Sequence, residues 1–161
     1  ITSKQTYPAC VVALKVFLGS TARETVEFVQ ALKKKSTERL RLGRIKAVAD
    51  GSIQGFSARM RWPGYHNGAP NGLWYTAPDQ LSDLYKLSLE AGIQVHTHTN
   101  GAEATEMAWD MLEGALKEHS SPDHRFTLQH CQLAEEGQFR RMKQLDMCVN
   151  LFTNHHHYSG N

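Results

Sequence analysis

Short apolar runs rich in β-branched residues alternate with segments of helical periodicity along this chain. The runs lie at residues 9–17, 45–49, 93–98, 125–131 and 147–153. Short runs of this kind are typical of strands buried in a sheet. Because a helical segment separates each run from the next, and parallel strands require such crossovers, the sequence predicts an α/β fold built of parallel βα repeats.

The segments between these runs carry start and stop signals for helices. Thr21 and Glu24 have the spacing of a capping box, and Pro78 stands in the first turn of the helix that is expected to end at Gly92. Gly43 follows the first helical segment, and we expect it to end that unit before the next strand begins. The predicted helices and strands therefore cover most of the chain, apart from one long loop.

Two architectures are compatible with this order of elements. One is an open doubly wound sheet and the other is a segment of a (β/α)₈ barrel, which normally needs about 250 residues. The chain has 161 residues, begins at Ile1 rather than at a methionine and stops at Ser-Gly-Asn. We therefore expect a partial barrel domain over residues 1–161. Its first and last strands would have open edges, which favours a homo-oligomer formed through them.

The charge balance argues against two classes of partner. Lys and Arg number 18 and Asp and Glu 16, which gives a formal net charge of +2, so no strong attraction to nucleic acid or to an anionic membrane is predicted. No apolar stretch has the length of a membrane span. Three cysteines without a CxxC pair indicate reduced thiols and a cytoplasmic setting. We expect the ligand to be a small molecule.

Polar residues recur where the predicted strands end. Lys46 lies in the second strand, His96 and His98 lie in the third, and His130 ends the fourth. The carboxyl ends of parallel strands form one rim, where imidazoles from different strands can make a rigid metal site. His96 points the same way as His98 but lies one layer deeper, which favours a supporting role over ligation. Taken singly, Lys46 and His130 would be interpreted as a solvated lysine and an ordinary hydrogen-bonded histidine.

Three segments of the sequence resemble successive motifs of the amidohydrolase superfamily. They are Ile-Lys-Ala-Val-Ala-Asp-Gly-Ser at 45–52, Val-His-Thr-His-Thr-Asn-Gly at 95–101 and Phe-Thr-Leu-Gln-His-Cys-Gln at 126–132. They are closest to the amidohydrolase-3 branch, which includes N-substituted formamide deformylases. The resemblance implies about strands 3–7 of a (β/α)₈ TIM barrel. It also implies a metal-dependent hydrolase of non-peptide C–N bonds, with an amide-type small-molecule substrate and a divalent metal, often zinc.

The resemblance also implies a set of metal ligands. Lys46 corresponds to the strand-four lysine that is often carboxylated and bridges two metals, His98 to the strand-five ligand and His130 to the strand-six ligand. The ammonium of an uncarboxylated, protonated lysine has no lone pair for a metal, so this role requires the carbamate of Lys46. The family's strand-one His-x-His pair would lie upstream of these motifs and its strand-eight Asp, the general base, downstream, so the catalytic base is unassigned. Ala102 stands where this branch usually has an acidic residue.

Two questions stay open from the sequence. The loop at residues 51–76 carries the aromatic residues Phe56, Trp62, Tyr65, Trp74 and Tyr75. It would lie over the rim and either wall an apolar substrate pocket or pack on itself. The rival to an enzyme is a non-catalytic fragment, or a module that needs a partner chain to complete its fold. A metal-free open α/β enzyme is disfavoured because the sequence has neither a nucleophile motif nor a glycine-rich phosphate loop.

Overall fold

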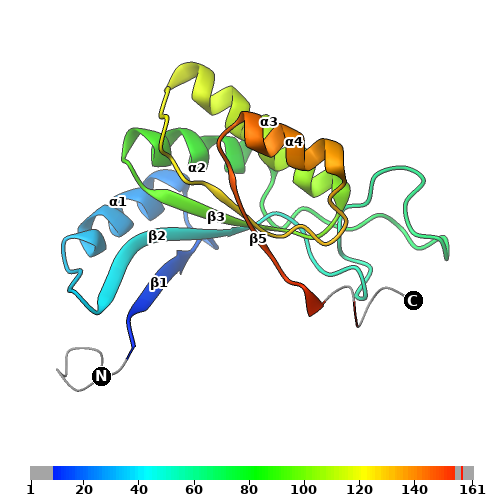
Figure 1. The fold of residues 1–161 in the computed structure, drawn as a ribbon, viewed down its shortest axis with the longest axis horizontal. Coiled ribbons are helices and arrows are strands. Elements are labelled where there is room, and N and C mark those ends of the chain that lie inside the picture. The colour runs from blue at the N-terminus through cyan, green and yellow to red at the C-terminus, as the bar shows by residue number, and fades with distance from the viewer. Residues whose placement is uncertain (1–8, 155–156, 158–161) are drawn as a thin grey trace.

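Strands and helices alternate along the chain (Figure 1). The structure is a computed structural model that describes residues 9–154 and 157. Its elements are β1 Val11–Val16, α1 Ala22–Lys33, β2 Leu40–Val48, α2 Pro78–Glu90, β3 Gln94–Thr99, α3 Ala102–Glu118, β4 Thr127–His130, α4 Glu136–Gln144 and β5 Cys148–Leu151. A long irregular segment, residues 49–77, connects β2 to α2.

The strands lie side by side in chain order, β1-β2-β3-β4-β5, and every neighbouring pair is parallel. The helices stand in a row on one face of this sheet (Figure 1). A doubly wound sheet reverses its strand order and carries helices on both faces, so that alternative is wrong for this chain. The predicted parallel βα repeats of a barrel segment are confirmed.

The helix start signals identified in the sequence are present. The Thr21 hydroxyl accepts a hydrogen bond from the Glu24 backbone N–H at 3.2 Å, and the Thr21 N–H donates to the Glu24 carboxylate at 2.9 Å. Pro78 is the first residue of α2, where a missing backbone donor costs nothing. These caps satisfy backbone groups that the first turn of a helix leaves without partners.

The face of the sheet that meets the helices forms the hydrophobic core. In β2, Ile45 and Ala47 are fully buried, whereas Lys46 and Val48 on the opposite face are half-buried. The largest fully buried side chains are Tyr85, Phe126, Ile45, Leu81, Leu84, Ile93, Leu112, Leu128, Met142, Val29, Val95 and Thr25. Burying one large apolar side chain stabilises a fold by roughly 1.5–3 kcal/mol. Because strand side chains alternate, this core directs Lys46 to the face away from the helices.

The second strand begins earlier than predicted, at Leu40, and Gly43 lies inside it instead of ending the preceding unit. The register between β1 and β2 shifts near this point, so β2 carries an extra residue there. Gly43 has φ +101°, and a Cβ built on it would lie 2.7 Å from Cβ of Lys33. The glycine therefore makes a bulge beneath the end of α1, where any side chain would collide. The other strands match the predicted ranges apart from a residue or two at their ends.

The outer strands β1 and β5 leave apolar side chains exposed. Val12 and Val16 of β1 are 47% and 45% exposed, and Leu151 of β5 is 54% exposed. Among the described residues each of these strands has a neighbour on one side only. The edges expected from the sequence are therefore present, with unpaired backbone groups beside apolar side chains.

Two further features of the described residues bear on the sequence predictions. None of the cysteines forms a disulfide: Cys10 and Cys148 are exposed, and Cys131 is buried. No helix within residues 9–154 has the length and apolar character that crossing a bilayer requires.

Candidate metal centre

The carboxyl ends of β2, β3 and β4 meet at one edge of the sheet. The register pairs Val48 with His98, and His98 with Gln129. These side chains lie on the face turned away from the helices, whereas Thr97 on the other face is buried and its hydroxyl lies 2.7 Å from the Tyr85 hydroxyl of α2. The rim therefore presents side chains from three strands on one surface.

His98 and His130 come together at this rim. Their ring centroids lie 4.7 Å apart, with the planes at 65°. Regular alternation would place His130 on the helix side, because it pairs with Thr99 in the register. Its backbone instead has φ +77°, in the left-handed region, and Cys131 follows with φ +47°. This irregular end of β4 brings the His130 ring against His98.

The His98 ring is held by the segment that follows β2. Its Nε2 lies 3.1 Å from Asn100 Nδ2 and 3.4 Å from the Gly51 carbonyl oxygen. Asn100 Nδ2 also donates to that carbonyl at 2.9 Å. In the tautomer that carries its proton on Nδ1, Nε2 accepts from Asn100. A metal bound through Nε2 would have to displace this amide.

Lys46 lies on the same face, one pair of residues deeper than the two histidines. The register pairs it with His96, while Val48 is the neighbour of His98. Its ammonium donates to the side-chain oxygen of Gln129. Burial lowers the pKa of Lys46 to about 8. The structure thus joins His98 to His130 and places Lys46 below them.

Gln129 connects Lys46 to His96. Because the lysine can only donate, it fixes the Gln129 oxygen toward itself, and the Gln129 amide nitrogen then donates to Nδ1 of His96 at 3.2 Å. His96 therefore carries its proton on Nε2, which is buried and has no hydrogen-bond partner among the described residues. Burial, with Lys46 and Arg44 as lesser causes, lowers the pKa of His96, which favours the neutral ring. The supporting role expected for His96 agrees with this geometry.

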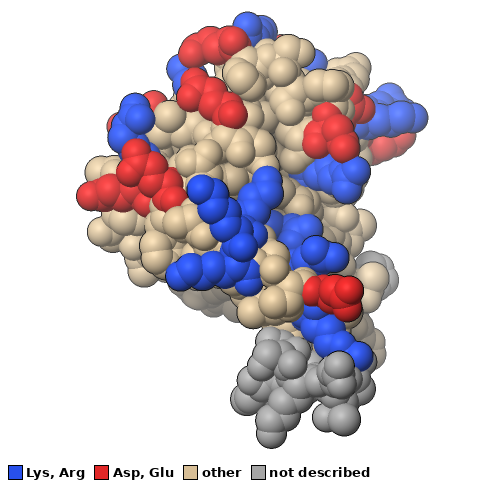
Figure 2. Space-filling view, turned by 90° about the vertical axis from the view of Figure 1, so that its left-hand side faces the viewer, with Lys and Arg blue, Asp and Glu red and all other residues tan. Residues whose placement is uncertain are grey.

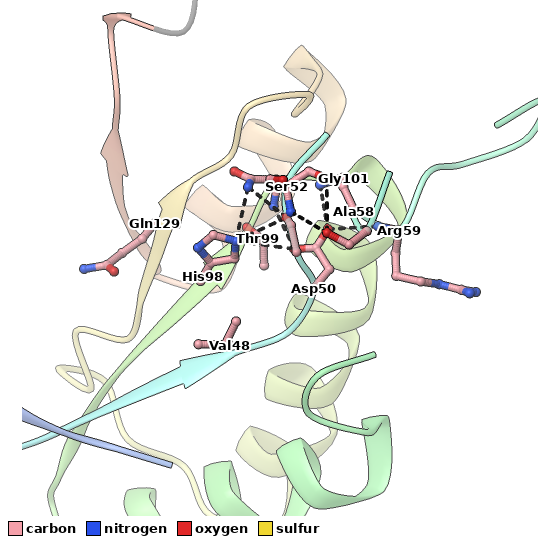
Figure 3. A network of polar contacts seen from close by, with 12 residues as sticks. Val48, Asp50, Ser52, Ala58, Arg59, His98, Thr99, Gly101 and Gln129 are labelled. Atoms are coloured by element: carbon pink, nitrogen blue, oxygen red, sulfur yellow. Dashed lines mark hydrogen bonds and ion pairs between the residues drawn. The ribbon is translucent and has the colours of Figure 1, made fainter. Parts of the chain in front are cut away.

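Asp50 is the main polar residue of the rim that the sequence interpretation passed over (Figure 3). It is fully buried and accepts three backbone N–H groups: Arg59 to Oδ2 at 3.0 Å, Asn100 to Oδ1 at 2.9 Å and Gly101 to Oδ2 at 2.8 Å. Burial raises the pKa of Asp50, although these donors and His98, whose Nε2 lies 4.0 Å from Oδ1, act in the opposite direction. Asp50 ties the end of β2 to the start of α3.

Arg59 holds the long loop of residues 49–77 against the start of α3. Its guanidinium donates to the Gly72 carbonyl at 2.9 Å and to Glu103 at 2.8 Å, and it lies over the Trp74 ring at 4.7 Å from the centroid. A Cβ built on Gly101 would lie 1.9 Å from the Arg59 carbonyl oxygen, so the close approach requires glycine. Glu103, beside the non-acidic Ala102, supplies the acidic partner on α3.

The aromatic residues of the loop divide into two groups. Phe56 and Tyr65 pack edge to face with centroids 5.3 Å apart, and the Tyr65 hydroxyl donates to the Ala58 carbonyl at 3.0 Å. Trp74 lies under Arg59 and against the core. Trp62, in contrast, is 90% exposed. The loop therefore packs partly on itself, and Phe56, Leu73 and Tyr75, which are 49%, 69% and 58% exposed, face solvent together with Trp62.

The residues at the rim meet part of what a divalent metal requires. Two imidazoles from different strands at this spacing are suitable donors for zinc. Within residues 9–154 and 157, no group of three or more His, Cys, Asp or Glu side chains is arranged to hold a metal ion. Both oxygens of Asp50 accept backbone hydrogen bonds, so this carboxylate holds the backbone at the rim. The rim thus brings two imidazoles together, and their binding of a metal stays a prediction.

Known proteins resemble this chain in sequence. A 120-residue stretch is 31% identical to Protein LONG AFTER FAR-RED 3 of Arabidopsis thaliana, covering 74% of this chain and 20% of that protein. A 129-residue stretch is 24% identical to the putative amidohydrolase YtcJ of Bacillus subtilis strain 168, covering 80% and 24%. The chain thus spans between a fifth and a quarter of the length of these relatives.

Solved structures share the fold. An uncharacterized metal-dependent hydrolase from Pyrococcus furiosus matches with a TM-score of 0.68 and 22% identity over 83% of this chain and 28% of that one. A second uncharacterized metal-dependent hydrolase, from Pyrococcus horikoshii OT3, matches with a TM-score of 0.66 and 20% identity over 88% and 28%. The sequence model of the amidohydrolase family, in its amidohydrolase-3 branch, matches residues 1–161. The parallel βα order, the rim and this match agree, and the chain belongs to the amidohydrolase family.

Proposed function

We propose that this chain forms part of a metal-dependent hydrolase that acts on non-peptide C–N bonds in small amide-type molecules. The observation that carries the proposal is the pair of imidazoles, His98 and His130, 4.7 Å apart at the carboxyl rim of a parallel sheet. The amidohydrolase family match and the likeness to metal-dependent hydrolases support it. Zinc is the cation that best suits such nitrogen donors.

In this proposal, His98 and His130 bind the cation, and a carbamate formed on Lys46 is a third ligand. The cation, when bound, supplies Lewis acidity for hydrolysis of an amide carbonyl. In its uncarboxylated form Lys46 donates to the Gln129 oxygen, and the Gln129 amide nitrogen contacts His96, so Gln129 orients both side chains. Asp50 keeps His98 in place by holding the backbone of Asn100, the neighbour whose amide contacts the ring.

Equilibrium dialysis of the purified chain against a buffer of known free zinc concentration, followed by metal analysis, tests the binding half of the proposal. We expect weak binding of one zinc per chain, because two histidines and an optional carbamate are fewer than the ligands of a complete site. His130→Ala should abolish it. His119→Ala is the matched control, since His119 is an exposed imidazole at the far end of α3 and should leave zinc binding unchanged.

Hydrolysis of N-formyl and N-acyl amines with added zinc tests the catalytic half. We expect little or no turnover by this chain, because the described residues present no identified general base at the rim. A longer chain that includes further strands of the barrel should hydrolyse such amides and lose this activity with His130→Ala. Zinc bound equally by wild type and by His130→Ala would contradict the proposal.

A second candidate function rests on the open edges of the sheet. Exposed valines on β1 and an exposed leucine on β5 lie beside unpaired strand edges, and such edges invite another chain or segment to pair with them. The chain would then be a non-catalytic module completed by a partner or by a second copy. Sedimentation at increasing concentration tests completion by a second copy, since a monomer with uncovered edges at high concentration would exclude it.

A further inference from the structure

The end of the sheet opposite the metal rim contains a pocket of about 590 Å³. It lies where β2, β3 and β4 begin, and its lining includes Arg41 and Arg44 of β2, Gln94 of β3 and Arg125 just before β4. Its volume is within the range of small-molecule sites. Since parallel strands run away from it toward the rim, it is separate from His98 and His130.

The lining of this pocket is strongly cationic. Lys33, Arg41, Arg44 and Arg125 carry four positive charges, and Asp123, the acidic residue among the lining side chains, offsets one of them and leaves three. Asp123 is fully engaged, because Nε and Nη2 of Arg125 donate to its two oxygens at 2.8 and 2.9 Å. Figure 2 looks onto this side of the molecule, where Lys and Arg side chains gather across the middle of the face. The pocket therefore favours an anion.

Helix termini account for part of this charge. The ammonium of Lys33, in the last turn of α1, donates to the Gly92 carbonyl behind α2 at 3.0 Å, as expected for a cation near helix carboxyl ends. The arginines come from strands or strand entries, so helix dipoles do not explain them.

Arg44 is oriented by a network that contains no carboxylate among the residues the structure describes. Its Nε donates to the Gln94 side-chain oxygen at 2.8 Å, and the Gln94 amide nitrogen donates to the Arg125 carbonyl at 2.7 Å. Gln94 is thereby fixed from both ends, and the guanidinium it holds is pre-organised. An arginine fork held in this way suits a phosphate group, which accepts several N–H donors at once.

Polar and apolar groups complete the lining. Ser88 is fully buried, and its hydroxyl has no hydrogen-bond partner among the described residues. Leu42, Leu89 and Phe126 add apolar surface. Such a mixture suits an organic molecule that carries an anionic group rather than a bare ion.

We propose that this pocket binds a small phosphorylated molecule, with Arg41 and Arg44 as the main ligands of its phosphate group. The site is independent of the proposed hydrolytic function, because it lies at the other end of the strands. Zinc loading and His130→Ala should both leave it unchanged.

Titration of the ¹⁵N-labelled chain with pyrophosphate, at constant ionic strength set by sodium chloride, tests the proposal by NMR. We expect saturable shifts confined to amides near residues 33–44, 88–94 and 121–126. The double variant Arg41→Gln/Arg44→Gln should weaken binding by about tenfold or more. The matched control Arg140→Gln/Lys143→Gln removes two exposed cations of α4 and should leave the dissociation constant unchanged.

Three results would overturn the phosphate site. They are the absence of saturable shifts at millimolar pyrophosphate, shifts centred on the metal rim, and equal weakening by the double variant and its control. If the double variant does not give a folded spectrum, Arg41→Gln alone decides the question, because the Arg41 side chain is exposed. Its expected loss of affinity is about threefold, and unchanged affinity would count against the site.

Discussion

The central and outer strands of this sheet differ in their backbone pairing and in the exposure of their side chains. β2 and β3 are paired on both sides, and their carboxyl ends are clamped by Asp50, which accepts three backbone donors. β1 and β5 are paired on one side among the described residues and expose apolar side chains. The comparison shows that specific geometry is concentrated in the centre, where the candidate metal ligands lie. Changes there should cost stability, whereas changes at the edges should alter association.

The largest effect is expected for Asp50→Ala. Removing the carboxylate leaves three backbone N–H groups without their acceptor at a fully buried position, which should lower the free energy of unfolding by about 3–5 kcal/mol. Urea denaturation measures the change. Asp50→Asn retains an acceptor oxygen and should lose less. Asp83→Ala, at an exposed position of α2, is the control and should change stability by less than about 0.5 kcal/mol. Equal losses for Asp50→Ala and Asp83→Ala would show that the hydrogen bonds accepted by Asp50 do not stabilise the centre of the sheet.

A smaller but still large effect is expected for Gly101→Ala. The added Cβ would meet the Arg59 carbonyl oxygen at 1.9 Å, so the loop must move, at a cost of about 2–3 kcal/mol. Gly114→Ala is the matched control, because a Cβ there meets nothing within 4 Å inside α3. That change should instead stabilise the chain by roughly 0.5–1 kcal/mol. Thermal unfolding of the two variants should therefore shift in opposite directions, and shifts of the same sign would mean that the rim is not tightly packed.

The reactivity of the cysteines compares the centre of the sheet with its edges and requires no change in the stability of the chain. Cys131, buried at the end of β4, has a pKa raised by burial to about 11, although the Thr99 hydroxyl opposes the shift. Cys10 and Cys148, before β1 and within β5, are exposed. At pH 8 a thiol reagent should modify the two exposed cysteines quickly and Cys131 only after denaturant is added. Modification of all three at one rate in the native chain would show that the centre opens as readily as the edges.

The Cys131 thiol also predicts a pH dependence. An unfolded thiol ionises near pH 8.5, whereas folded Cys131 keeps its proton until about pH 11. Between these values the unfolded state binds fewer protons than the folded state, so the free energy of unfolding should fall as pH rises. The decline should be shallower in Cys131→Ala, and identical pH profiles above pH 8 would contradict the raised pKa.

The smallest effect on stability is expected at the edge. Val12→Lys places a charge on the exposed edge strand β1 and should change the free energy of unfolding by less than about 0.5 kcal/mol. It should nevertheless reduce self-association, as measured by sedimentation velocity across a concentration series. Phe28→Lys is the control, because Phe28 is 50% exposed on helix α1 rather than on the edge strand. Equal reduction by both variants would mean that exposed apolar area, rather than the strand edge, drives association.

The order and direction of the strands could be predicted because apolar runs and helical segments alternate locally along the chain. The start of β2 could not. Arg41, Gly43 and Arg44 interrupt the apolar pattern, and the reason for Gly43 is the passage of Lys33 close above it, a contact between separate elements. A contact between separate elements of this kind cannot be predicted from the local pattern of residues.

The candidate site could be predicted only in part, because some of its contacts join residues that are far apart in the sequence. His98 and His130 lie where the motif order places them, and the structure brings their rings together. Their role as metal ligands, with Lys46, stays a prediction. Asp50 and Gln129 stand within the recognised motifs, but their roles could not be predicted. Asp50 contacts Asn100 and Gly101, and Gln129 contacts Lys46, and these partners lie far away in the sequence. An aspartate directly after a buried strand and before a glycine was the available signal.

Cobalt titration of a double-mutant cycle at the two histidines tests the central claim most directly. If His98 and His130 hold one cation, His98→Ala and His130→Ala should each weaken cobalt binding by about tenfold or more, and the double variant should be little worse than either single variant. The visible absorption of cobalt bound to the wild-type chain should disappear in all three. Independent, additive losses, or wild-type spectra in the single variants, would show that the two rings do not share a metal.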